Sequence, residues 1–142
     1  MKSHLKIFLL SLLLLSGLSY AEVPPDIEGI YNKCRDKADN TVEINECSSK
    51  RLEAYDAQLN IAYKKSLAKC SESENPKLCR EELKEAERNF VKYKESMLKH
   101  MEKYSMYRDG TIFSMVYLNF AADLTKLQYE TLQDNYVGEE AP

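Results

Sequence analysis

Apolar side chains recur at helical spacing along most of this chain, and no useful length of it alternates between apolar and polar residues as a strand does. One stripe runs through residues 44–70, a second through residues 83–104 and a third through residues 113–131. Spacings of three and four residues place such side chains on one face of a helix. The pattern therefore predicts three long helices, each with one apolar face.

The second and third stripes define the faces that we expect to be buried. The second consists of Leu83, Ala86, Phe90, Tyr93, Met97, Met101 and Tyr104. The third consists of Phe113, Val116, Phe120, Leu124, Leu127 and Thr131.

Capping residues indicate where the helices begin and end. Asn40 resembles an N-cap, and Glu43 three residues later completes a capping box. Asn75 followed by Pro76 is a second start signal, and Gly110 is expected to end that helix in a left-handed conformation. A short first helix is expected over about residues 27–38. The fold class predicted is an all-α bundle of three long helices plus a short N-terminal helix.

Residues 1–21 have the features of a secretory signal peptide. Lys2 and Lys6 precede an apolar run, and the small-x-small triplet Ser19-Tyr20-Ala21 predicts cleavage after Ala21. The run is shorter than the roughly 20 apolar residues that a membrane-spanning helix needs, so no stable membrane anchor is expected. We therefore expect residues 22–142 to form one domain in the periplasm or outside the cell.

All four cysteines lie after the predicted cleavage point, in an oxidising compartment. Three pairings of Cys34, Cys47, Cys70 and Cys79 are possible. We favour Cys34–Cys47 and Cys70–Cys79, because each would bridge a short segment and staple two helices together. Zinc binding is the competing interpretation, but these spacings lack the closely spaced cysteine pairs of structural zinc sites.

The charge of the mature chain narrows its possible partners. Residues 22–142 hold 18 basic and 23 acidic side chains, a formal charge of −5. Nucleic acid is disfavoured as a partner, because binding to phosphates needs a basic surface. A cationic protein partner is compatible with this charge.

No catalytic constellation is apparent, and we predict a protein that is not an enzyme and needs no cofactor. The mature chain has one histidine, His100, and no nucleophile elbow or glycine-rich phosphate loop. Thioethers with an imidazole can bind Cu(I), so Met97, His100, Met101 and Met106 form a weak copper alternative. Core packing of the methionines is the simpler interpretation.

Two segments of the chain resemble the LprI-type lysozyme inhibitor domain. The first reads Cys34-x3-Ala38-x2-Thr41-x-Glu43-Ile44-x2-Cys47, then Leu52-x3-Asp56-x2-Leu59-Asn60-x2-Tyr63. The second reads Leu83-x2-Ala86-Glu87-x2-Phe90-x2-Tyr93-Lys94. The chain departs from the family pattern at Phe90, where tryptophan is usual, and at Lys94, where arginine is usual. The motif residues that we select as candidates are Asp56, Leu59, Asn60, Tyr63, Phe90 and Lys94.

The resemblance implies an exported, α-helical, non-enzymatic inhibitor of a cell-wall hydrolase. The expected partner is a lysozyme, which is a cationic protein, or another envelope hydrolase. The inhibitor would occlude the cleft of this enzyme. The alternative is a periplasmic interaction or assembly factor, or an immunity-type binding protein, without lysozyme activity.

Geometry alone suggests two loops as candidate binding elements, and each could equally be a solvated connection between helices. One is the acidic turn with Glu72, Glu74 and Asn75. The other is the segment Arg108, Asp109, Gly110 and Thr111.

Overall fold

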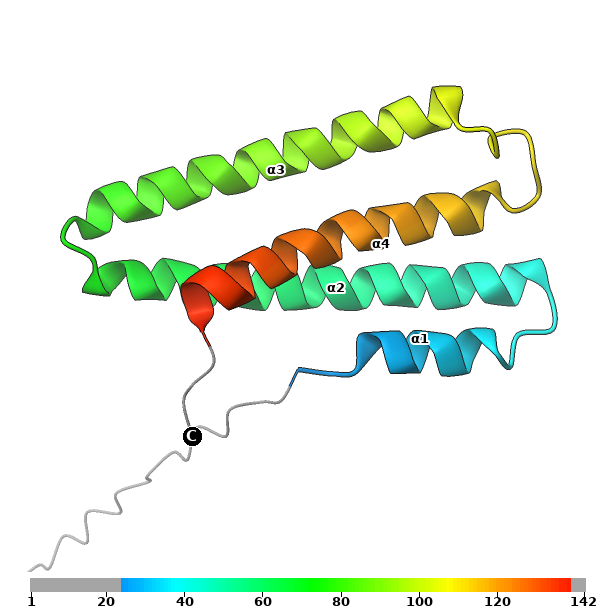
Figure 1. The fold of residues 1–142 in the computed structure, drawn as a ribbon, viewed down its shortest axis with the longest axis horizontal. Helices are drawn as coiled ribbons and strands as arrows, with labels where there is room; N and C mark the ends of the chain where they lie inside the picture. Colours follow the sequence, from blue (N-terminus) through cyan, green and yellow to red (C-terminus); the bar gives the residue numbers. More distant parts are fainter. Residues whose placement is uncertain (1–23, 139–142) are drawn as a thin grey trace, which may run out of the picture.

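The computed structural model describes residues 24–138, and the predicted signal peptide lies outside them. Within that range the chain is helical and has no strand, which confirms the predicted fold class. The helices are α1 (Ile27–Arg35), α2 (Thr41–Lys69), α3 (Pro76–Tyr104) and α4 (Phe113–Leu132). A 3-10 turn at Cys70–Glu72 links α2 to α3, and a π-helical turn at Gln133–Val137 extends α4 (Figure 1). None of the described helices combines the length and the apolar character required to cross a bilayer.

Two predicted helix starts are confirmed by hydrogen bonds. The Asn40 side chain accepts from the Glu43 amide at 3.1 Å, and the Glu43 carboxylate accepts from the Asp39 amide at 2.8 Å. The Asn75 side chain accepts from the Leu78 amide at 3.1 Å, with Pro76 in the first turn of α3. These side chains satisfy amides that have no partner within the helix.

The predicted helix ends were less accurate. The first helix ends at Arg35 rather than near residue 38. The third ends at Tyr104, because Ser105 adopts an extended conformation with φ −62° and ψ 138°. The expectation of a left-handed Gly110 was wrong. Gly138 alone has a positive φ among residues 24–138.

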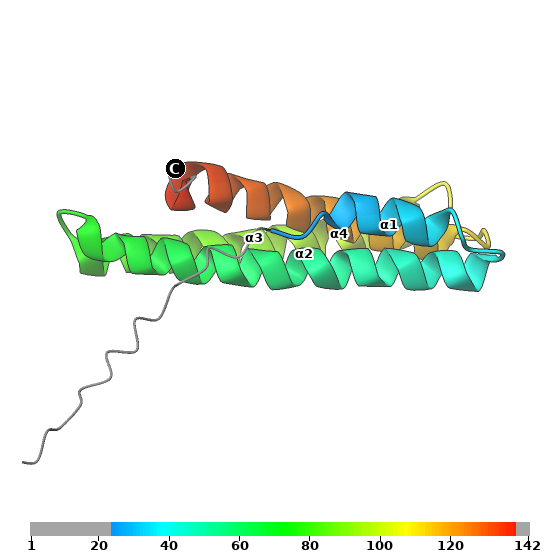
Figure 2. The same cartoon turned by 90° about the horizontal axis from the view of Figure 1, so that it is seen from below.

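Helix α2 is the centre of the structure. Helices α1 and α4 lie over one face of α2, whereas α3 lies beside it (Figures 1 and 2). Small side chains on both helices are buried where α4 meets α2, and they permit close packing of the backbones. These residues are Ser48, Ala62 and Ser66 on α2, and Ala121, Ala122 and Thr125 on α4.

Helix α3 is attached much less closely than α4. Of its 29 residues, only Leu83 is buried. Figure 1 shows α3 diverging from α2 toward its C-terminal end. The predicted burial of Tyr93, Tyr104 and Ala86 was therefore wrong, since all three are exposed.

The buried face of α4 also differs from the one predicted. Leu124 is buried as expected, but Leu127 is 63% exposed and Thr131 is exposed. The small residues Ala121, Ala122 and Thr125 are buried instead, since small side chains let two helix backbones pack closely. The periodicity of the sequence identified an apolar stripe on α4, but it did not identify which residues in and beside this stripe face α2.

Both favoured disulfides are confirmed. Cys34–Cys47 joins α1 to α2 and Cys70–Cys79 joins the end of α2 to the start of α3, with Cα–Cα distances of 5.8 and 5.6 Å. No cysteine of the described range is free. Each bridge therefore fixes one short connection between helices.

Candidate functional site

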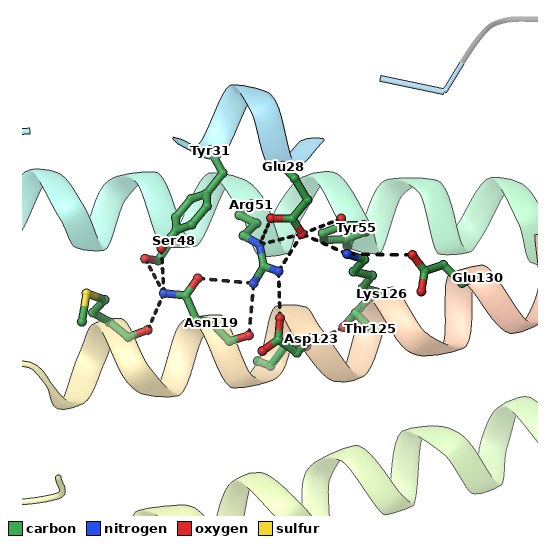
Figure 3. A network of polar contacts seen from close by, with 12 residues as sticks. Glu28, Tyr31, Ser48, Arg51, Tyr55, Asn119, Asp123, Thr125, Lys126 and Glu130 are labelled. Carbon is green, nitrogen blue, oxygen red and sulfur yellow. Dashed lines mark hydrogen bonds and ion pairs between the residues drawn. The ribbon is translucent and has the colours of Figure 1, made fainter. Parts of the chain in front are cut away.

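A buried arginine joins three helices. Arg51 of α2 is 8% exposed, and its Nη2 lies 2.7 Å from both Glu28 Oε1 of α1 and Asp123 Oδ1 of α4 (Figure 3). Tyr55 donates to the same Glu28 oxygen at 2.8 Å, and Lys126 lies 3.4 Å from it. A buried guanidinium needs such partners, because its desolvation is costly.

A half-buried amide, that of Asn119, extends this network toward the N-terminal end of α4. The Asn119 side chain donates to the hydroxyls of Tyr31 and Ser48, both at 3.1 Å, and to the Met115 carbonyl at 3.0 Å. Arg51 in turn donates to the Asn119 carbonyl at 3.3 Å. The network therefore sets how α1, α2 and α4 lie relative to one another (Figure 3).

The electrostatics of Glu28 reflect these contacts. Burial alone would raise its pKa, but hydrogen bonds from Arg51 and Tyr55 and the charges of Arg51 and Lys126 outweigh it and lower the pKa to about 2. Burial and the Glu28 carboxylate raise the pKa of Tyr55. Glu28 is thus a carboxylate, and Tyr55 a neutral donor, at any physiological pH.

The sequence analysis missed this network, although one signal for it was present. Arg51 lies four residues after Cys47 and four before Tyr55, which places a charge on the apolar face of α2. The partners on α1 and α4 lie 23 and 72 residues away and could not be identified from spacing. The members of the network bind one another across three helices, so we assign it a structural role.

The two candidate loops lie at opposite ends of the molecule. The acidic turn follows α2, whereas the segment 108–111 lies between α3 and α4 at the other end of α3 (Figure 1). Helix α3 has 29 residues, so the two loops are separated by about 40 Å. They cannot enter one cleft together.

In the acidic turn, one candidate residue already has a structural role. Asn75 caps α3, as described above. Glu72 and Glu74 are exposed, and no hydrogen bond or ion pair in the described part of the chain involves their side chains. The turn is therefore a charged connection without an apolar surface of its own.

The connection between α3 and α4 carries an exposed apolar cluster, which we call the tip. Its members are Tyr104, Met106, Tyr107 and Ile112. Met106 is 87% exposed and Tyr104 is 71% exposed. Large exposed side chains grouped in this way are typical of interaction surfaces. The sequence analysis noted the abundance of tyrosine but did not place these residues together.

Local hydrogen bonds order the loop at the tip. The Arg108 guanidinium donates to the Lys103 carbonyl at 2.7 Å and to the Asp109 carboxylate at 3.1 Å. The Gly110 amide donates to the Tyr107 carbonyl at 2.9 Å. Preorganisation of this kind reduces the entropy lost on binding.

The six motif residues line a shallow groove between α2 and α3. One hollow of about 430 Å³ includes Asp56, Leu59, Asn60, Phe90 and Lys94 in its lining. An adjoining hollow of about 390 Å³ includes Tyr63. Both hollows include Glu87 and Val91, so together they form one groove.

Some motif residues have a clear structural role within the groove. Lys94 of α3 lies 3.2 Å from Asp56 of α2 and donates to Thr125 of α4 at 2.7 Å. Leu59 is buried and Phe90 packs against the same cluster. These contacts are among the few that hold α3 against the rest of the molecule.

The methionines of the copper alternative do not point to a common site. Met97 and Met101 are half-buried, whereas His100 and Met106 are exposed. The His100 ring lies 4.9 Å from the Tyr104 ring. Within residues 24–138, no three histidine, cysteine or acidic side chains are grouped so that they could hold a metal ion.

Comparison with known families identifies one match. The family model for the lysozyme inhibitor LprI matches residues 34–132, which include both disulfides, the groove and the tip. No curated protein matches the chain, and no solved structure does.

Proposed function

Because the chain belongs to the LprI lysozyme inhibitor family, we propose that it acts by binding a lysozyme and occluding its cleft. The family match carries this proposal, since it covers most of the mature chain. An exported inhibitor is consistent with the signal features of residues 1–21 and with two disulfides. We propose that it meets its target in the periplasm or outside the cell.

We propose that the tip is the element that enters the cleft. It lies at one end of the molecule (Figure 1) and holds exposed tyrosines, a methionine and an arginine, residue types that are enriched at the centres of interfaces. Next to the acidic turn, α3 exposes Leu78, whereas the tip groups four large apolar side chains. An apolar end fits a concave cleft better than a solvated acidic turn does.

Arg108 supplies a polar group at the same end. Its Nε and Nη1 are engaged by Asp109 and Lys103, and no hydrogen bond of the described residues uses Nη2. Glycoside hydrolases, lysozyme included, act through a pair of carboxyl groups in the cleft. A guanidinium held in place at the tip could therefore pair with a catalytic carboxylate of the target.

The test is inhibition of cell-wall lysis by a c-type lysozyme, with purified and oxidised residues 22–142 titrated in. We expect dose-dependent inhibition that saturates near one molecule of inhibitor per lysozyme. The double substitution Tyr104→Ala/Met106→Ala should weaken inhibition by about tenfold or more, because it removes exposed anchors without touching the core.

The matched control is Glu72→Gln/Glu74→Gln in the acidic turn at the other end. It should leave inhibition within about twofold of the wild type, apart from the effect of net charge. If this control lost inhibition and the tip variant kept it, the acidic turn would be the binding element. Binding without inhibition would favour the interaction-factor alternative.

A further inference from the structure

We infer that the groove between α2 and α3 is a second binding surface, which takes an amphipathic helix of a protein partner with acidic residues at one end. The groove lies along the middle of α3, whereas the tip lies beyond its C-terminal end. The inference concerns a different surface from the proposed lysozyme site and stands independently of it.

Three cations surround one half of the groove. Lys84, Arg88 and Lys92 line the smaller hollow together with Tyr63, Val91 and one acid, Glu87, whose carboxylate accepts from Gln128 of α4 at 2.9 Å. All three cations are exposed. Among the ion pairs and side-chain hydrogen bonds of residues 24–138, none involves them. Cations that have no partner in the chain, set around apolar carbon, favour carboxylates on an otherwise apolar ligand.

The other half of the groove is lined by acidic side chains. Asp56, Glu95 and the shared Glu87 line the larger hollow, and Lys94 there is already engaged by Asp56 and Thr125. A ligand that spans both halves should thus be acidic near Arg88 and neutral or basic near Glu95. An anionic membrane is disfavoured, because its headgroups would meet Asp56 and Glu95 as well as the lysines.

The length and floor of the groove suit a helix. From Lys84 to Leu98 it follows α3 for about 21 Å, which equals about four helical turns. Its floor is partly apolar, with Val91 45% exposed and Tyr63 half-buried. An amphipathic helix binds such a groove with side chains at i, i+3, i+4 and i+7. A small molecule would remain largely solvated in so open a hollow.

The test uses a synthetic helical peptide of about four turns, with leucines at positions i, i+3, i+4 and i+7. Glutamates lie along one half of the peptide, and a tryptophan lies at the other end. The protein contains no tryptophan, so fluorescence from the peptide reports binding directly. We expect saturable binding to oxidised residues 22–142 that weakens as salt rises. Lys84→Glu/Arg88→Glu should weaken it by about tenfold or more.

The matched control is Lys33→Glu/Lys37→Glu, which changes the net charge equally but lies on and just after α1. It should retain most of the affinity, and Val91→Ala should lose part of it without unfolding α3. Lysozyme inhibition should not fall in the Lys84/Arg88 variant and should equal that of the Lys33/Lys37 control, which has the same net charge, so the two surfaces are tested separately. The inference would be overturned if a peptide with lysines in place of the glutamates bound equally well. It would also be overturned if the protein bound phosphatidylglycerol vesicles but not the peptide. A third such outcome is self-association of the protein that Lys84→Glu/Arg88→Glu abolishes.

Discussion

At the scale of single residues, Arg51 determines how the helices meet. It is the only buried charged residue of the described chain, and its partners come from α1 and α4. The sequence identified local features correctly, such as the Asn40 and Asn75 caps, because these depend on residues three positions apart. The Arg51 contacts were not predictable, because they depend on the packing of helices that are distant in the sequence.

Replacement of Arg51 by alanine should destabilise the fold by about 3–5 kcal/mol, since it leaves Glu28 and Asp123 without their partner. Urea unfolding followed by circular dichroism measures this loss. Arg35→Ala is the control, because Arg35 is exposed and pairs only with the exposed Asp36. A loss equal to that of the control would mean that the network contributes nothing to stability.

Glu28 should make stability depend on acid pH. Its pKa in the folded chain is about 2, below its ordinary value of 4.5, so the folded state favours the carboxylate. The contribution is present above about pH 4.5 and is lost as the pH falls toward 2. Urea unfolding at a series of pH values should show a steeper decline in this window for the wild type than for Glu28→Gln. If the stability of both proteins declined in parallel as the pH fell, the lowered pKa of Glu28 would be contradicted.

At the scale of whole helices, α3 differs from the others. Its apolar stripe predicted a helix correctly, but most of that stripe is not buried, because α3 touches the rest along a narrow edge. Periodicity reports which side chains share a face and says nothing of how closely a neighbour covers it. Of this stripe, Phe90 lines the groove and Tyr104 belongs to the tip.

Removal of the Cys70–Cys79 disulfide should loosen α3 selectively. Cys70→Ala/Cys79→Ala should cost about 2–4 kcal/mol of stability. Hydrogen exchange should accelerate more in α3 than in α2 or α4, because α3 has few other contacts. The companion variant Cys34→Ala/Cys47→Ala should instead affect α1. Uniform acceleration across all helices in both variants would show that the bundle opens as one unit.

At the scale of the whole molecule, charge is distributed unevenly. Residues 76–112, which include α3 and the tip loop, carry nine basic and seven acidic side chains. The remainder of residues 22–142 carries nine basic and sixteen acidic ones. Helices α1, α2 and α4 together carry eight basic and seven acidic side chains, so the acidic excess lies in the segments that precede, join and follow the helices.

This excess should accelerate the encounter with a cationic lysozyme. Its field extends about 30 Å at 0.01 M salt but only about 8 Å at 0.15 M, so the association rate constant should fall several-fold between these conditions. The dissociation rate should change much less, because it depends on the contacts at the tip rather than on long-range attraction. Surface plasmon resonance over a salt series measures both rates. A charge-neutralising change at the other end of the molecule, Glu72→Gln/Glu74→Gln in the acidic turn, should lower the association rate alone (Figure 1). If the association rate did not respond to salt or to this variant, charge would have no part in recognition, and the apolar tip would have to account for the whole of it.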